Sequence, residues 1–110
     1  MDEYFQALTE LRDFLEGHGD RYCAPRLRGF VEEYKSLQER QASKSTYADH
    51  YQEVIGNIAG GMGSISDLTL SLEGGHFVDR SSIREVNRKK DKLTEILYQS
   101  AKRSLAEVSK

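Results

Sequence analysis

A run of glycines in the middle of the chain constrains the fold most. Residues 60–63, here called the glycine turn, are Gly-Gly-Met-Gly, with Met62 the one residue that carries a side chain. Glycine adopts positive φ without steric cost, so such a run lets the backbone leave a helix and reverse direction. The hydrophobic period also changes here, from helical spacing before the turn to alternation after it. We therefore expect helices before residue 60 and a different structure directly after it.

Three helices are expected before the glycine turn. Apolar residues recur every three or four positions over residues 2–16, over residues 25–37 and from Ser45 or Thr46, which can cap the third helix, up to the turn. Pro25 suits the first turn of the second helix, where its missing N–H costs nothing. Three tyrosines of these stripes are expected in the core: Tyr34, Tyr47 and Tyr51.

A β-hairpin is expected after the glycine turn. Alternating leucines suit a half-buried strand, and Gly74 with Gly75 suits the two central positions of a hairpin turn. The alternating residues are Leu68, Leu70 and Leu72. In this register two pairs face each other across the strands: Glu73 with His76, and Leu72 with Phe77.

One long helix is expected to close the chain. Ser82 and Glu85 match a capping box, and an apolar stripe continues from residue 83 to residue 108, interrupted at Lys89 and Lys90. The predicted fold is therefore mainly α with a small β component: three N-terminal helices, one hairpin and one long C-terminal helix. The length of 110 residues fits a single domain, residues 1–110.

The composition limits the possible functions and locations of the protein. Cys23, the single cysteine, excludes an intramolecular disulfide and is expected to be a small buried residue. No apolar run is long enough to span a bilayer and the acidic N-terminus lacks the features of a secretion signal, so a cytoplasmic location is expected. The first 16 residues are acidic and residues 80–110 are basic, which favours mutual attraction of the terminal helices.

Several chemistries are disfavoured, and we predict no catalytic residue, cofactor or metal. The glycine turn follows a helix and precedes an extended segment, the reverse of a phosphate-binding loop. The three histidines lack metal-ligand spacing, and His50, between Asp49 and Glu53, suits a solvated helix face. The basic run around Lys90 is interleaved with acids, so nucleic-acid binding is not expected.

The remaining polar and aromatic residues suit protein recognition. Tyrosine offers a large contact area with few rotors, and carboxylates complement a basic partner. The candidate partner-binding residues are Tyr22, Asp67, Glu73, His76 and Asp79. Asp67 has a second possible role, because its carboxylate can cap backbone amides freed by the glycine turn. The expected structural motif consists of Gly60, Gly61, Met62, Gly63, Ser64 and Asp67.

The segment Gly60-Gly61-Met62-Gly63-Ser64-Ile65-Ser66-Asp67-Leu68-Thr69-Leu70 resembles a family of small, largely uncharacterised bacterial proteins with a Gly-Gly-Met-Gly-Ser-x-x-Asp-Leu-x-Leu motif. The helix containing Leu11-Arg12-Asp13-Phe14-Leu15 is similar to a Leu-Arg-x-x-Leu helix of that family. The chain departs from it at Ile65, where an aromatic residue is usual, and at Tyr22-Cys23, where a tryptophan is usual. Such small acidic proteins resemble the immunity proteins of bacterial toxin systems.

This resemblance implies a non-enzymatic protein that binds a cognate bacterial toxin domain and covers its active site or substrate surface. Free of its partner, the chain is expected to be a monomer or homodimer that contacts neither nucleic acid nor membrane. Two alternatives remain open. The chain could be a regulatory or scaffold subunit that self-associates through its long last helix, or a small hydrolase that uses His50 or His76 with nearby acids.

Overall fold

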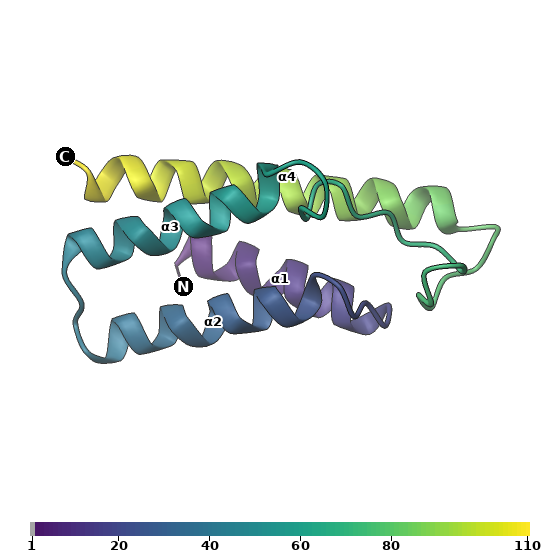
Figure 1. Ribbon diagram of the computed structural model, residues 1–110, viewed down its shortest axis with the longest axis horizontal. Coiled ribbons are helices and arrows are strands. Elements are labelled where there is room, and N and C mark those ends of the chain that lie inside the picture. Colours follow the sequence, from purple (N-terminus) through teal and green to yellow (C-terminus); the bar gives the residue numbers. More distant parts are fainter. Residues whose placement is uncertain (1) are drawn as a thin grey trace.

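Four α-helices make up the regular structure of residues 2–110. The computed structural model describes residues 2–110, and its helices are α1 (Glu3–Gly17), α2 (Ala24–Glu39), α3 (Lys44–Ala59) and α4 (Ile83–Val108). They alternate in direction along the chain, and α4 extends along most of the molecule's length (Figure 1). This confirms the three N-terminal helices and the long C-terminal helix predicted from the apolar periodicity.

The apolar stripes of the helices meet in one core. Helix α4 packs against both α1 and α3, and α2 packs against α1 and α3. Leucines, valines and alanines fill the centre, with an aromatic cluster between the first halves of α1 and α3 and the second half of α2. Its members are Tyr4, Phe5, Tyr34, Tyr47, His50 and Tyr51. The three tyrosines predicted as core residues pack there as expected, Tyr47 being only half-buried.

Antiparallel packing of the terminal helices brings opposite charges together. Glu3 at the start of α1 forms an ion pair with Arg103 near the end of α4, at 2.7 Å. Near the other end of α1, the ammonium of Lys89 lies 5.6 Å from the centre of the Phe14 ring. The opposite charges of the two chain ends thus meet at this contact.

The capping contacts of two helices differ from expectation. Ser43 caps α3 by accepting a hydrogen bond from the Thr46 N–H, so Ser45 and Thr46 lie inside the first turn. The predicted capping box at α4 does not form. Ser82 makes no side-chain cap bond, and its hydroxyl donates instead to the carbonyl of Asp79. Helix α4 nevertheless begins directly after Ser82.

The predicted β-hairpin is wrong. The structure contains no β-strand between residues 2 and 110, and residues 60–82 form one irregular connection, here called the crossover loop. A turn does form, one residue earlier than predicted, with the Gly75 N–H donating to the Leu72 carbonyl. Glu73 and Gly74 are its central residues, and the predicted pairing of Glu73 with His76 and of Leu72 with Phe77 does not exist.

The alternating leucines do not share one environment. Leu70 is fully buried, Leu68 is half-buried and Leu72 is exposed. The backbone N–H and C=O of Leu70 bond the side-chain amide of Asn87 on α4, so a side chain takes the place of a neighbouring strand. A pattern of alternation cannot distinguish these two ways of satisfying backbone groups.

None of the helices formed by residues 2–110 combines the length and apolar character that crossing a membrane requires.

Candidate functional site

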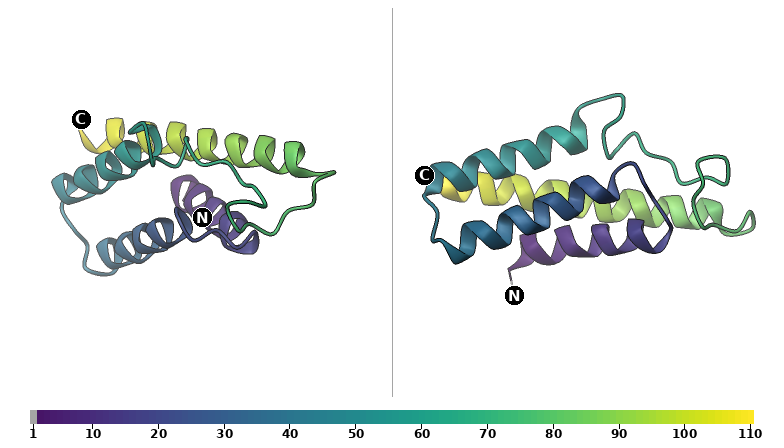
Figure 2. Two further views of the ribbon diagram at one scale, coloured as in Figure 1. Left: turned by 45° about the vertical axis from the view of Figure 1, so that its right-hand side comes forward. Right: turned by 60° about the horizontal axis from the view of Figure 1, so that its bottom comes forward.

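The crossover loop lies against the end of the bundle where α1 ends and α2 and α4 begin. It leaves α3 at the glycine turn, follows the first half of α4 and turns back before α4 starts (Figures 1 and 2). Its backbone joins the α1–α2 connection directly, because the Phe77 N–H donates to the His18 carbonyl at 2.7 Å. We consider this end of the molecule the candidate functional site.

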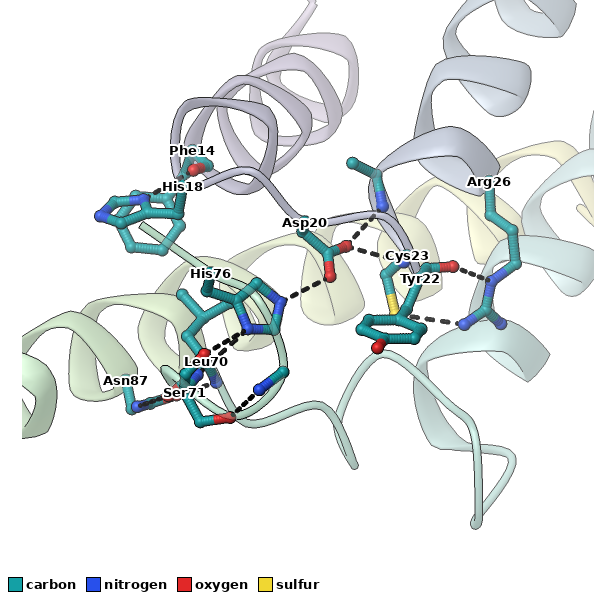
Figure 3. A network of polar contacts seen from close by, with 12 residues as sticks. Phe14, His18, Asp20, Tyr22, Cys23, Arg26, Leu70, Ser71, His76 and Asn87 are labelled. Carbon is teal, nitrogen blue, oxygen red and sulfur yellow. Dashed lines mark hydrogen bonds and ion pairs between the residues drawn. The ribbon is translucent and has the colours of Figure 1, made fainter. Parts of the chain in front are cut away.

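A buried histidine attaches the loop to the helices. The imidazole of His76 reaches from the loop to Asp20, just before α2 (Figure 3). Because a carboxylate can only accept, Nε2 of His76 donates to Asp20 Oδ1 at 2.9 Å. Nδ1 lies 3.1 Å from the backbone nitrogen of Ser71 and 3.2 Å from its carbonyl oxygen. Both side chains are buried. We call this pair the His76–Asp20 latch.

Asp20 also starts helix α2. Its other carboxylate oxygen accepts the backbone N–H groups of Cys23 and Ala24, at 2.7 and 2.8 Å. Burial by itself raises the pKa of Asp20, but the hydrogen bonds from His76 and from backbone N–H groups outweigh it and lower the pKa below its ordinary value. The carboxylate is thus held ionised between the loop and the helix.

Arg26 on α2 holds the glycine turn. Its guanidinium donates to the Gly63 carbonyl at 2.8 Å and to the side-chain oxygen of Asn57 on α3 at 3.1 Å. It also lies 3.1 Å from the sulfur of Cys23 (Figure 3). Cys23 is buried, as predicted, and burial raises the pKa of its thiol despite the nearby Arg26.

The glycine turn has the backbone conformations that its composition suggests. Gly61 and Gly63 have positive φ, whereas Gly60 and Met62 do not. Asp67 accepts the Gly63 N–H at 3.2 Å, which is the capping contact considered from the sequence. Ser64 is buried and its hydroxyl accepts the Asp67 N–H. Asp67 and Ser64 therefore close the turn onto itself.

Large apolar side chains are exposed around the latch. Phe77 is 71% exposed, Tyr22 59% and Leu72 43%. The Tyr22 ring lies 6.0 Å from the His76 ring, and the edge of Phe77 lies directly over Gly19. Leu72, Phe77 and Asp79 line one shallow hollow. We call Tyr22, Leu72, Phe77 and Asp79 the docking face.

The structure brings together only some of the candidate partner-binding residues. Tyr22, Glu73 and Asp79 are exposed near the latch, whereas His76 is buried within it. Asp67 is exposed but belongs to the glycine turn, beside Met62, which is 98% exposed. Three residues of the site were not predicted from the sequence: Asp20, Arg26 and Asn87. An aspartate shortly before a helix that starts with proline was an available signal for Asp20.

His50 is buried, contrary to the solvated helix face expected for it. Its Nε2 accepts the hydroxyl of Tyr4 at 2.7 Å, and its Nδ1 bonds the carboxylate of Glu33 on α2. Burial raises the pKa of the Tyr4 phenol above its ordinary value. Both nitrogens of His50 and both nitrogens of His76 make hydrogen bonds within the protein.

No cluster of three or more histidine, cysteine or acidic side chains suited to a metal ion occurs among residues 2–110. Comparison of the chain with models of protein families, with curated proteins and with solved structures found no match.

Proposed function

We propose that this protein is a non-enzymatic, immunity-type binding protein that neutralises a bacterial toxin domain by placing the docking face against it in the cytoplasm. The exposure of Phe77 on a fixed backbone carries the proposal. Its own N–H bonds His18, and its neighbour His76 is locked to Asp20. An aromatic side chain held out from an ordered segment is the typical anchor of a protein interface.

Preorganisation of the loop supports a binding function. Association costs free energy when loops must be ordered, and that cost falls when the loop is already fixed. The crossover loop contacts the α1–α2 connection, α2 and α4 through its own backbone and through His76, Arg26 and Asn87. A partner would therefore meet a shaped surface, with Glu73 and Asp79 available to attract basic groups.

The proposal is tested by capture followed by reconstitution. The tagged protein is expressed in its own bacterium and captured at high salt, and a stoichiometric partner is identified by mass spectrometry. The purified partner is then titrated by calorimetry, and its toxic activity is measured with and without the protein. We expect one-to-one binding and inhibition. Absence of a stoichiometric partner, or a partner that stays active in the complex, would overturn the proposal.

Matched variants locate the surface. Replacing Leu72 and Phe77 together by serine should weaken binding by roughly 1,000-fold, because interface anchors are each worth about 2 kcal/mol or more. Ile96, an exposed residue of α4, provides the control Ile96→Ser. Equal affinity of the two variants would exclude the docking face, and loss with Ile96→Ser alone would favour association through α4. Circular dichroism confirms that each variant is folded.

A further inference from the structure

The hollow in the docking face is lined by both apolar and polar residues. It has a volume of about 540 Å³, within the range of ligand pockets. Apolar side chains form its walls, and polar groups lie among them. The lining residues are His18, Leu72, His76, Phe77, Val78, Asp79, Ser82 and Val86.

The polar side chains of the hollow present acceptors and no free donor. Nδ1 of His18 bonds the Phe14 carbonyl at 2.9 Å, so the proton of the neutral ring lies on Nδ1 and Nε2 is an acceptor. The Ser82 hydroxyl donates to the Asp79 carbonyl, and both nitrogens of His76 are engaged in the latch. The exposed Asp79 carboxylate has no hydrogen bond or ion pair with any residue from 2 to 110.

From this pattern we infer that the hollow accepts an arginine or lysine side chain of the partner protein. The inference rests on the proposed function and specifies the chemistry of its partner. The aliphatic stem of such a side chain would cover Leu72 and Val86, and its cationic head would donate to Asp79. The exposed ring of Phe77 can also receive a cation over its face.

Other side chains fit the hollow less well. A carboxylate would meet Asp79 with like charge and would find no donor on the lining side chains. An aliphatic or aromatic side chain would fill the walls but leave the Asp79 carboxylate dehydrated and unpaired, which is unfavourable. The aliphatic part of a basic side chain can pack against the apolar walls, and its cationic head can donate to the acceptors.

Calorimetry with the captured partner tests the inference through a matched pair of variants. Asp79→Asn removes the charge in the hollow, and Asp49→Asn makes the same change at an exposed position of α3. We expect Asp79→Asn to weaken binding by roughly tenfold and to reduce its dependence on salt, while Asp49→Asn leaves both unchanged. If Leu72→Ser with Phe77→Ser abolishes binding while Asp79→Asn has no effect, the inference fails and the proposed function stands.

A second measurement does not need the partner. Titration with N-acetyl-arginine methylamide should shift the amide NMR signals of residues 77–79 with an affinity on the order of 10 mM, as small ligands with few contacts bind weakly. The corresponding glutamate derivative should give no shifts, and Asp79→Asn should abolish those of arginine. Absence of shifts at these residues would overturn the inference even if a partner is found. Micromolar affinity would indicate a free small cation as the occupant instead.

Discussion

The side-chain amide of Asn87 pairs with both backbone polar groups of Leu70. Its oxygen accepts the Leu70 N–H at 2.7 Å, and its nitrogen donates to the Leu70 carbonyl at 2.9 Å. A side chain thus makes the two bonds that an adjacent strand would make in a sheet. Because Leu70 is fully buried, this pairing allows an irregular segment to place an apolar side chain in the core.

Removing this pairing should release the loop. For Asn87→Ala we expect the free energy of unfolding to fall by about 1–3 kcal/mol, because two backbone groups lose their partner. Urea unfolding measures the change, and hydrogen exchange at the Leu70 amide should accelerate. Gln99→Ala, at an exposed position of the same helix, should change stability by less than about 0.5 kcal/mol. Equal effects of the two substitutions would show that the pairing contributes nothing.

The latch should make stability depend on acid pH. The native pKa of Asp20 lies below its ordinary value of about 3.9, so the stabilisation is complete above the unfolded pKa and is lost as pH falls through the native pKa. For Asp20→Asn we expect a loss of about 1–3 kcal/mol at pH 7. Urea unfolding between pH 7 and pH 2 provides the measurement.

The acid end of that series is the diagnostic part. Wild type should lose more stability than Asp20→Asn as the pH falls below about 4, so the two curves should converge. Parallel curves would mean that Asp20 carries no native pKa shift. His18→Gln changes a half-buried histidine outside the latch and should leave the acid branch unchanged.

Replacing Gly63 or Gly56 by alanine should change the stability of the protein in opposite directions. Gly63 has φ +81°, so Gly63→Ala should reduce stability by about 1 kcal/mol through backbone strain. Gly56 lies inside α3 with open space around its Cα, so Gly56→Ala should raise stability by about 0.5–1 kcal/mol. Thermal unfolding of the two variants distinguishes the cases, and a change of the same sign in both would contradict this explanation.

Lys90 is a fully buried cation with few partners. Its ammonium bonds the Ser66 carbonyl at 3.3 Å and lies 3.5 Å from the Asp91 carboxylate, which is largely exposed. Burying a charge costs free energy, and an apolar residue of similar volume removes that cost. Lys90→Met should therefore raise the free energy of unfolding by about 1 kcal/mol. The exposed control Lys92→Met should stay within about 0.5 kcal/mol of wild type; a clear loss with Lys90→Met would show that the Ser66 bond outweighs the burial.

The sequence predicted the parts of the fold that depend on local patterns. Periodic apolar residues located all four helices, and α4 begins at Ile83 as expected, because a long amphipathic stripe has few alternatives. The glycine turn was placed correctly, since positive φ at Gly61 and Gly63 favours glycine over other residues. The alternation after the turn led to the wrong prediction of a strand, because Leu70 is buried without being in a strand.

The site depends on pairs of residues distant in sequence. His76 and His50 were both expected at the surface, yet each is buried and forms a hydrogen bond with a carboxylate from another part of the chain. Asp20 is 56 residues away from His76, and no local pattern links them. Exposed Tyr22 and Asp79 could be proposed from residue type alone, whereas the importance of Phe77 follows only from how the loop is held.

The separation of the latch partners in sequence bears on the order of folding. Because they are 56 residues apart, forming the pair closes a long loop, and we expect this to happen late in folding. Contacts that form after the transition state act on the unfolding rate and leave the folding rate nearly unchanged. Substitutions in the latch should therefore shorten the lifetime of the native state, and the crossover loop should be the first segment to detach under a denaturant or a pulling force.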